Sequence, residues 1–327
     1  MSGAAVLVVR PSSLGDIVHA LALVADIRAH RPELAIDWVG EESFVPLIML
    51  DPDVRRTIPV ALRRWRHQPM SLATWNEMAA FRRDLRRESY AAILDLQEQV
   101  KGALIARAAR GPTHGPDRAS IREPIATLAH NAHHRIDPAQ HLIDRCRQLA
   151  AAALGYDLAG PPRFHIVPPP RSQGDAIPET PYAVFVHATS RRDKLWPEAS
   201  WRALMTGFAR SNFAIVLPWG SDDERDRSER IAAQESAAIV PPRQTLPQIA
   251  GLLARADLVV GVDTGLVHLA AALGAPTVSL FVATDPLLAG VARASALARD
   301  LGGVGIIPAP DEVHAAAGTL VRRMAHC

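Results

Sequence analysis

Short apolar runs alternate with longer amphipathic stretches along almost the whole chain. Runs of six or seven mostly apolar residues predict buried strands, and they cover residues 5–10, 35–40, 91–97, 182–188, 213–219, 256–262 and 276–282. Between them, apolar residues repeat at helical spacing, which predicts helices over 16–30, 77–90, 139–155 and 265–274. This alternation is typical of an α/β fold whose parallel sheets carry helices on both faces.

One segment interrupts the pattern. Residues 166–181 (IVPPPRSQGDAIPETP) are rich in Pro, Ser and Gly, which predicts a linker between domains. A chain of 327 residues is also too long for one ordinary core. We therefore predict two doubly wound, Rossmann-like domains, 1–165 and 166–327, with the carboxyl ends of their strands lining a central cleft. In this scheme the last helix can pack back on the N-terminal domain.

Charge and cysteine content narrow the class of protein. The 36 basic and 34 acidic residues leave a net charge of +2, which argues against a general attraction to polyanions, and we expect no nucleic-acid partner. Cys146 and Cys327 are too few and too distant in sequence for a disulfide framework. The first residues lack the basic segment of a signal peptide, and no run of about eighteen apolar residues occurs. These features predict a soluble, cytoplasmic protein.

The loop after the first predicted strand carries an acid where a nucleotide-binding fold often has a glycine-rich turn. Its sequence is PSSLGD, residues 11–16, and Gly15 permits close approach of a ligand. Asp16 suits a helix N-terminus, where the dipole favours negative charge, so it can serve as a helix cap. It is equally well placed to act as a general base at the carboxyl end of a strand. The loop sequence does not distinguish these two roles.

A second loop, HATSRRDKLWP (187–197), has the composition of a phosphate-binding site. The hydroxyls of Thr189 and Ser190 and the ammonium of Lys194 suit phosphate oxygens and the charge of a departing diphosphate. The alternative is a solvated turn, which is the commoner fate of such a charged run. The Trp196-Pro197 pair favours a fixed loop.

A third stretch, VVGVDTGLVHLAAALG (259–274), contains an Asp-Thr-Gly triplet. This triplet occurs in aspartic proteases, but those enzymes are all-β proteins, and here a helical pattern follows at once. A strand, a tight turn at Asp263 and a helix start predict an anion site made by the amides of residues 264–266. His268 can reach the same anion, although a lone histidine is more often a packing residue.

Three weaker signals remain. Glu224, in LPWGSDDERDR, can bind ribose hydroxyls or cap a helix. In ALRRWRHQP, three arginines surround Trp65 and suit carboxylate or phosphate groups, although such a run is usually a solvated face; they are Arg63, Arg64 and Arg66. The stretch HNAHHR (130–135) clusters three histidines, but a zinc site needs more ligands at defined spacing, and we predict no metal site.

Taken together, these motifs resemble the lipopolysaccharide heptosyltransferases of glycosyltransferase family 9. The similarity runs nearly end to end, through RPSSLGDIVHALAL, DWVGEESF, IPVALRRWR, ILDLQEQVKGALIARAARG, HGPDRASIREPIA, HATSRRDKLWPEASWRAL, LPWG, VDTGLVHLAAALGAPTVSLF and ATDP. The arginine–tryptophan stretch and IREP favour the heptosyltransferase I group of this family.

The resemblance implies a GT-B fold and a specific reaction. In that family L-glycero-D-manno-heptose moves, with inversion, from ADP-L-glycero-β-D-manno-heptose to the Kdo region of Kdo2-lipid A. The resemblance implies no metal and no other cofactor. It also implies a peripheral position on the cytoplasmic face of the inner membrane.

The resemblance further implies roles for individual residues. Asp16 takes the proton from the Kdo hydroxyl, and Lys194 screens the charge of the leaving diphosphate. The implied donor contacts are Ser13, Thr189, Ser190, Lys194, Glu224, Asp263, Thr264, Gly265, Leu266 and His268, with Glu224 on the ribose. The implied acceptor contacts are Arg63, Arg64, Arg66 and Arg122.

Two segments depart from the family pattern. The Gln-Gly that usually follows the Asp of the third predicted strand is Gln97-Glu98 here. The usual Gly-Pro-Thr-Asp-Pro is Val-Ala-Thr-Asp-Pro at 282–286, with fewer glycines after it.

Three other activities stay open as alternatives. A heptosyltransferase II shares the donor but acts on a heptosylated core. A nicotinamide-dependent dehydrogenase requires a G-x-G-x-x-G turn that the first predicted strand lacks. A non-catalytic sugar-nucleotide binder needs the turn at 263–268 but has no need of Asp16.

Overall fold

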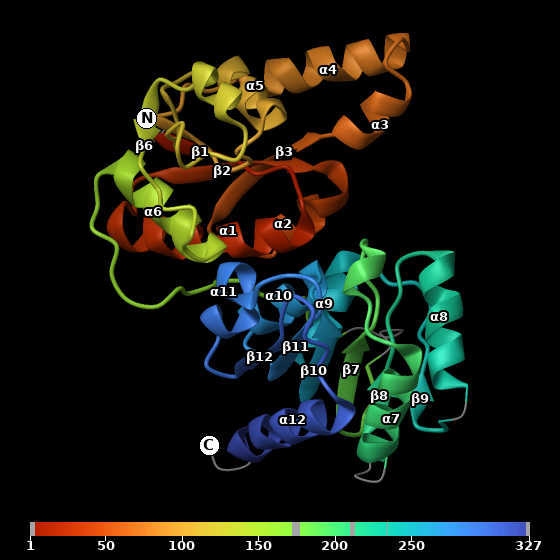
Figure 1. Ribbon diagram of the computed structural model, residues 1–327. Helices are drawn as coiled ribbons and strands as arrows, with labels where there is room; N and C mark the ends of the chain where they lie inside the picture. Colours follow the sequence, from red (N-terminus) through yellow and green to blue (C-terminus); the bar gives the residue numbers. More distant parts are fainter. Residues whose placement is uncertain (1–3, 172–176, 210–212, 234, 325–327) are drawn as a thin grey trace. The chain divides into compact units, whose positions relative to one another are not determined.

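The computed structural model of this chain divides into two compact units, Met1–Ile166 and Val167–Cys327. The structure describes residues 4–171, 177–209, 213–233 and 235–324. The predictions for Cys327 and for residues 172–176 of the linker fall outside these ranges. Each unit contains a parallel sheet with helices on both faces, which confirms the α/β prediction (Figure 1).

The sheet of the first unit has the strand order β3-β2-β1-β4-β5-β6. Its strands are β1 (Ala5–Val9), β2 (Ala35–Glu41), β3 (Val54–Val60), β4 (Ala92–Asp95), β5 (Thr113–Pro116) and β6 (Ala132–His134). Its α-helices are α1 (Leu14–His30), α2 (Val45–Ile48), α3 (Leu62–His67), α4 (Leu72–Leu85), α5 (Val100–Ala108) and α6 (Leu142–Leu154). Helices α1 and α6 pack together on one face, whereas α3, α4 and α5 lie on the other (Figure 1). There Leu7 and Val9 of β1 share a buried cluster with Trp65 and Ile105.

The second unit repeats this plan with the strand order β12-β11-β10-β7-β8-β9. Its strands are β7 (Tyr182–Val186), β8 (Ala214–Val216), β9 (Ala238–Ile239), β10 (Leu258–Val262), β11 (Thr277–Phe281) and β12 (Ala298–Gly302). Its α-helices are α7 (Glu198–Ala209), α8 (Asp222–Ala232), α9 (Leu246–Ala254), α10 (Gly265–Ala272), α11 (Pro286–Ala289) and α12 (Pro310–Met324).

In both sheets the strand order reverses at the centre. The first unit runs outward from β1 through β2 to β3 and then returns to β4, which pairs with the other side of β1. In the second unit β7 and β10 are the corresponding neighbours. Open α/β sheets bind their ligands outside the carboxyl ends of the strands at such a reversal. The loops that follow β1, β4, β7 and β10 are therefore the expected binding loops.

The apolar pattern predicts the central strands better than the outer ones. All seven predicted runs contain an observed strand, whereas β3, β5, β6, β9 and β12 are not predicted. These five lie toward the outside of the sheets, where strands are short or carry charged residues and proline, as VRRTIPV does in β3. The helix predicted over 77–90 is α4, which begins and ends five residues earlier.

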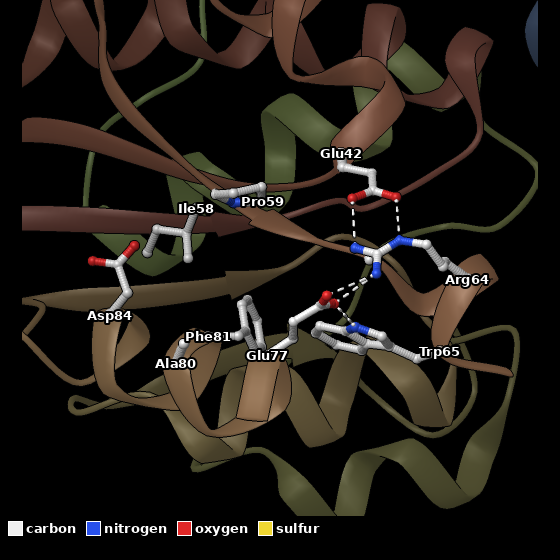
Figure 2. Close-up of a pocket in the computed structure, with 10 residues that line it drawn as sticks. Glu42, Ile58, Pro59, Arg64, Trp65, Glu77, Ala80, Phe81 and Asp84 are labelled. Atoms are coloured by element: carbon white, nitrogen blue, oxygen red, sulfur yellow. Dashed lines mark hydrogen bonds and ion pairs between the residues drawn. The ribbon is translucent and has the colours of Figure 1, made fainter. Parts of the chain in front are cut away.

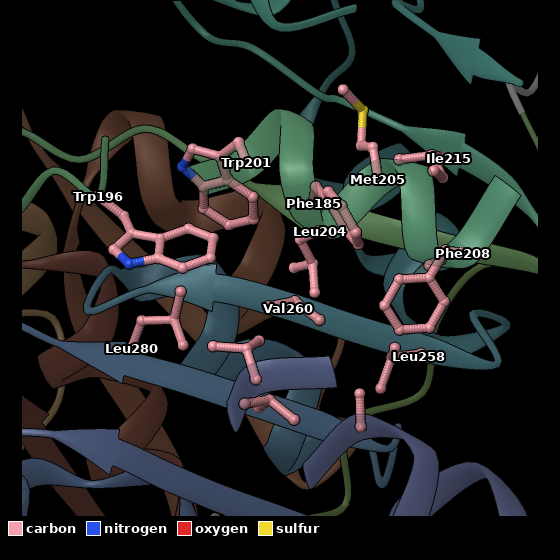
Figure 3. Close-up of a cluster of buried hydrophobic side chains, with 14 of the residues drawn as sticks. Phe185, Trp196, Trp201, Leu204, Met205, Phe208, Ile215, Leu258, Val260 and Leu280 are labelled. Carbon is pink, nitrogen blue, oxygen red and sulfur yellow. The ribbon is translucent and has the colours of Figure 1, made fainter. Parts of the chain in front are cut away.

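The core of the second unit holds the last helix. Figure 3 shows Phe185, Trp196, Trp201 and Phe208 packed against β10 and β11. The apolar residues of α12 that join this cluster are Val313, Ala317 and Leu320, all fully buried. The apolar side of this helix is thus covered by the sheet of its own unit. Packing of the last helix on the N-terminal domain stays a prediction.

Candidate active site

The loop between β1 and α1 holds Asp16 by three contacts. Ser13 is the N-cap of α1, and Asp16 is the third residue of the helix. The Asp16 Oδ2 accepts hydrogen bonds from the Ser13 backbone N–H and from its hydroxyl, each at 2.8 Å. Its Oδ1 lies 3.0 Å from the guanidinium of Arg10, which is almost fully buried. Asp16 is thus the acid of a capping box rather than the cap itself.

These contacts determine the charge state of Asp16. Burial by itself raises the pKa of the carboxyl, but the charge of Arg10 and the hydrogen bonds from Ser13 outweigh it, so the pKa lies below its ordinary value of 3.8. The side chain is still 33% exposed. Asp16 is therefore ionised near neutral pH, and an incoming hydroxyl can reach it.

The loop that follows β4 lies beside this acid. The Ser12 backbone N–H donates to Gln97 Oε1 at 3.2 Å, and the Lys101 ammonium lies 3.5 Å from the Ser12 hydroxyl. Burial lowers the pKa of Lys101, and the positive charges of Arg66 and Arg10 lower it further. The region around Asp16, at the carboxyl ends of β1 and β4, is thus rich in positive charge, which suits an anionic ligand.

Glu98 occupies the position where the resemblance places a glycine. Its φ of 57° lies in the left-handed region, which glycine adopts freely and other residues rarely adopt. The carboxylate is buried and lies 2.6 Å from the guanidinium of Arg145 in α6. Burial raises the pKa of Glu98, although Arg145, Arg10 and the backbone N–H of Arg122 act in the opposite direction. This departure from the family pattern therefore introduces a buried ion pair next to the loop of Arg122.

One of the three arginines around Trp65 has a structural role. Figure 2 shows the Arg64 guanidinium between two carboxylates, with Glu42 at 3.1 Å and Glu77 at 2.8 Å. The indole N–H of Trp65 donates to the same Glu77 at 2.8 Å. Arg64 thus joins the loop after β2 to α4. Glu42 and Glu77 balance the charge of this guanidinium, and the acceptor contact of Arg64 stays a prediction.

The other predicted acceptor residues present their side chains to solvent. Arg63 is exposed, and its guanidinium lies 5.3 Å from the centroid of the Phe44 ring. Arg66 and Arg122 are exposed as well. Arg66 is close enough to Lys101 to lower the pKa of that amine. Arg66 and Arg122 therefore lie near the residues that follow β4, beside the loop of Asp16.

In the second unit, Asp263 brings residues from four segments together. It follows β10, and its Oδ2 accepts hydrogen bonds from Lys194 at 2.5 Å and from the Thr284 hydroxyl at 2.6 Å. Its Oδ1 lies 3.4 Å from the Nε2 of His268 in α10, and its backbone carbonyl accepts from the Thr189 hydroxyl at 3.3 Å. The loops after β7, β10 and β11 and the first turns of α10 thus meet at this carboxylate.

The contacts of Asp263 fix both its charge and the position of Lys194. Burial raises the pKa of the Asp263 carboxyl, but hydrogen bonds from His268, Lys194 and Thr284 more than offset it, so the pKa lies far below its usual range. The carboxylate is therefore ionised near neutral pH and balances the lysine charge. Asp263 thus orients Lys194 and Thr284, and its own contact with the donor stays a prediction.

Buried neighbours hold these loops against the rest of the second unit. The Trp196 side chain is fully buried, and its indole N–H donates to the Pro308 carbonyl at 3.0 Å, which anchors the segment that carries Lys194. Gly261 lets α10 approach β10 closely, because a Cβ atom there would lie 2.4 Å from a methyl group of Val267. The turn at 263–265 can therefore place the N-terminus of α10 directly against the end of the strand.

The remaining residues that are predicted to bind the donor also follow the carboxyl ends of strands in the second sheet. The amides of Thr264, Gly265 and Leu266 begin α10, where N–H groups lack partners within the helix. Ser190 is exposed in the loop after β7. Glu224 accepts a hydrogen bond from the Gly220 N–H at 2.7 Å in the first turn of α8, so the structure shows it in the capping role.

The histidine cluster has separate, structural partners. His130 is buried against Asp95 at 2.9 Å, His133 contacts the Thr127 carbonyl at 3.0 Å, and His134 contacts His114 at 3.1 Å. Among the described residues no group of three or more His, Cys, Asp and Glu side chains is arranged to hold a metal ion.

Sequence-based reasoning assigned no function to four residues of the two sites, namely Arg10, Glu98, Lys101 and Thr284. Arg10 had a usable signal, since a basic residue directly after a buried strand requires a partner. Thr284 and Glu98 lie in the two segments that depart from the family pattern. That departure distinguished the two segments but indicated no function for either residue. No sequence signal connects Lys101 to Ser12.

Comparison with known proteins agrees with this geometry. The family model of glycosyltransferase family 9 (heptosyltransferase) matches residues 78–302. The chain is 42% identical over 297 residues to lipopolysaccharide heptosyltransferase 1 of Salmonella typhimurium, covering 87% of this chain and 90% of the relative. It is only 25% identical over 303 residues to lipopolysaccharide heptosyltransferase 2 of the same organism, covering 86% and 83%.

Among solved structures, the E. coli heptosyltransferase WaaC with ADP is similar at a TM-score of 0.84 and 37% sequence identity. The match covers 98% of this chain and 99% of that one. Solved heptosyltransferases of this kind have the GT-B fold, and the two six-stranded parallel sheets match it. Within the described ranges, no helix has the length and apolar character needed to cross a membrane. This chain belongs to glycosyltransferase family 9, the heptosyltransferases.

Proposed function

We propose that this chain transfers L-glycero-D-manno-heptose from ADP-L-glycero-β-D-manno-heptose to a Kdo sugar of Kdo2-lipid A, with inversion at the anomeric carbon. Family membership supports a heptosyltransferase of lipopolysaccharide core synthesis. The higher identity to heptosyltransferase 1 than to heptosyltransferase 2 supports Kdo, rather than heptose, as the acceptor sugar. The observation that carries the proposal is the Asp16 carboxylate, which is ionised, fixed by Ser13 and Arg10, and still partly exposed.

In the proposed reaction Asp16 is the general base. The acceptor hydroxyl donates a hydrogen bond to the carboxylate, and its proton moves to Asp16 as the oxygen forms a bond to the anomeric carbon of the heptose. The bond between that carbon and the β-phosphate oxygen of ADP breaks on the opposite face. A single displacement of this kind inverts the configuration.

The second unit holds the donor in this proposal. The Lys194 ammonium, the Thr189 and Ser190 hydroxyls and the first amides of α10 supply donors for the diphosphate, which gains charge as it leaves. Asp263 keeps Lys194 and Thr284 in place, and His268 completes this group. We keep the ribose contact of Glu224 as a prediction, since its carboxylate also caps α8.

The first unit holds the acceptor. Arg63, Arg66 and Arg122 are exposed guanidiniums that suit the carboxylates and phosphates of Kdo2-lipid A, and they lie on the same unit as Asp16. Arg64 belongs to the same stretch and also contacts Glu42 and Glu77, and its acceptor contact is kept as a prediction. Because the acceptor is a lipid, we also propose that the protein works at the cytoplasmic face of the inner membrane.

Donor competition tests the proposal. Purified protein is supplied with Kdo2-lipid A and either ADP-heptose or the corresponding GDP- and UDP-sugars, and product is measured by mass spectrometry. We expect transfer from ADP-heptose, and we expect EDTA to leave the rate unchanged. Equal use of UDP- or GDP-sugars would contradict the donor assignment, and inhibition reversed by a divalent ion would contradict a metal-free reaction.

A further inference from the structure

Helix α4 presents apolar side chains to solvent instead of burying them. Among its residues only Thr74 and Leu85 are buried. The large apolar side chains that are more than 40% exposed on α4, just before it and on the neighbouring α5 are Met70 (88% exposed), Leu72 (81%), Trp75 (58%), Met78 (41%) and Leu104 (63%). We call these five residues the α4 face. Soluble proteins rarely expose so many large apolar side chains together unless the surface binds something.

Three residues of the α4 face, Trp75, Met78 and Leu104, line a groove. A cavity of about 550 Å³ lies between α4 and α5, and its lining includes Trp65, Trp75, Phe81, Leu104 and Ile105. Helices α4 and α5 run next to each other on the face of the first sheet opposite α1 and α6 (Figure 1). The groove therefore opens on a continuous apolar surface rather than on an isolated exposed residue.

The charges around the α4 face are predominantly positive. The basic residues that line this groove or the adjoining hollows are Arg66, Arg82, Arg83, Arg86, Lys101 and Arg110. The two acids on α4 are already neutralised, because Glu77 pairs with Arg64 and Asp84 pairs with Arg56. An apolar surface with tryptophan at its centre and a basic border is typical of a surface that lies in the interface of an anionic membrane.

The α4 face also leads to the proposed acceptor site. Lys101 lines the groove, and its ammonium lies 3.5 Å from the Ser12 hydroxyl, next to the loop of Ser13 and Asp16. Arg66 lines an adjoining hollow together with Lys101 and lowers the pKa of that lysine. A lipid held against the α4 face would thus have its sugar and phosphate groups near the proposed base.

We infer that the α4 face seats the protein on the surface of an anionic bilayer, with Leu72 and Trp75 inserted among the lipids and Arg82 and Arg83 on their phosphates. This inference rests on the proposed function, because it identifies how a lipid-borne acceptor reaches the site. A second copy of the chain is a less suitable occupant, since a two-fold contact would bring the same arginines face to face.

Vesicle binding tests the inference without any substrate. The full chain is sedimented with two kinds of vesicle. One contains phosphatidylcholine with about 30% phosphatidylglycerol, which mimics an anionic leaflet, and the other contains phosphatidylcholine alone. We expect binding to the anionic vesicles and at least about tenfold weaker binding for Leu72→Glu/Trp75→Glu and for Arg82→Gln/Arg83→Gln. The matched control is Val304→Glu, another exposed apolar residue (71%), which we expect to bind like the wild type.

Two further measurements separate the possible failures. Heptose transfer to a deacylated, water-soluble acceptor should be unchanged in Leu72→Glu/Trp75→Glu, which shows that the variant is folded and active. Wild-type protein that ignores anionic vesicles, or a variant that binds them as well as the wild type, would overturn the inference. A dimer that Leu72→Glu/Trp75→Glu dissociates, together with no vesicle binding, would overturn it in favour of a second copy. Loss of transfer to every acceptor by the wild type would instead refute the proposed function and leave the binding result standing.

Discussion

At Asp16, one side chain serves both the helix and the proposed chemistry. Its contact with the Ser13 N–H closes a capping box at the start of α1, and its contact with Arg10 neutralises a buried guanidinium. Both contacts stabilise the ionised carboxylate. The sequence-based alternatives of cap and base are therefore compatible, because the same geometry that caps the helix presents an ionised, partly exposed acid to a ligand.

We expect Asp16→Asn to reduce kcat by about 10²–10⁴-fold while ADP binding stays near that of the wild type, since general base assistance is lost and the donor contacts remain. Steady-state kinetics and calorimetry with ADP provide the two readouts. Asp222→Asn, an exposed acid in the first turn of α8, is the matched control and should keep full activity. Activity of Asp16→Asn within a few-fold of the wild type would remove Asp16 from this role.

The pH profile gives an independent check on the same residue. Because the pKa of Asp16 lies below 3.8, its protonation should not reduce kcat/KM until the pH falls below that value. Ser13→Ala removes one hydrogen bond to the carboxylate, so the pKa rises and the acidic limb of the profile should move to higher pH. An unchanged acidic limb in Ser13→Ala would contradict this assignment.

Glu98 is a position where two effects on stability oppose each other. The left-handed backbone costs a non-glycine residue about 1–2 kcal/mol, whereas removal of one partner from a buried ion pair costs about 3–5 kcal/mol. The second effect is the larger, although both side chains keep some exposure. We therefore expect Glu98→Gly to lower the free energy of unfolding by about 1–3 kcal/mol in urea denaturation.

Glu98→Ala is the matched variant, because it also loses the carboxylate but keeps a Cβ atom at a φ of 57°. We expect it to be less stable than Glu98→Gly by about 1 kcal/mol. If the alanine variant were the more stable of the two, backbone strain at this position would not be the reason that the family uses glycine there.

At the scale of elements, the sequence predicts strands where burial is continuous. β1, β10 and β11 are buried along their whole length and appear as plain apolar runs. β3 and β12 contain charged residues because they lie at the sheet edges, and β5 contains glycine and proline, so their pattern does not indicate a strand. The loops that lead to Asp16 and Asp263 were predictable because they follow the fully buried strands β1 and β10.

The contacts between distant elements were not predictable in the same way. Lys194 and Asp263 are 69 residues apart, and only the neighbouring positions of β7 and β10 bring them together. Arg64 lies in an arginine-rich stretch whose composition suits an anion site, yet Glu42 and Glu77 from two other elements neutralise its charge. Single-sequence patterns reveal which residues carry charge but not which partner each residue meets.

Helices α1 and α6 are joined by a buried ion pair that allows a test at this scale. Arg147 contacts both Asp26 oxygens, at 2.7 and 3.0 Å, and both side chains are almost fully buried. We expect Arg147→Leu to lower the free energy of unfolding by about 3–5 kcal/mol, because Asp26 is left buried without a counter-charge.

The double variant Asp26→Leu/Arg147→Leu should recover part of that loss, since no buried charge then lacks a partner. Urea denaturation of the two single variants and the double variant gives the coupling energy directly. Strictly additive losses would show that the two side chains stabilise the helices independently.

At the scale of the whole molecule, the two units repeat one topology but carry opposite chemistry at the reversal of their strands. The first unit presents an ionised acid paired with Arg10, and the second presents a lysine, hydroxyls and a helix N-terminus. With a net charge of only +2, neither substrate is attracted by the field of the whole protein, so these local groups must provide recognition. The division suits a donor and an acceptor that both carry phosphate but react through different atoms.

The central claim is heptose transfer to Kdo, and one acceptor competition tests it most directly. Purified protein and ADP-L-glycero-β-D-manno-heptose are supplied with equal amounts of Kdo2-lipid A and of a core that already carries one heptose, and the products are separated by mass spectrometry. We predict addition of one heptose to Kdo2-lipid A, none to the heptosylated core, and loss of the product with Asp16→Asn. Preferential addition to the heptosylated core, or transfer to neither acceptor, would contradict the assignment.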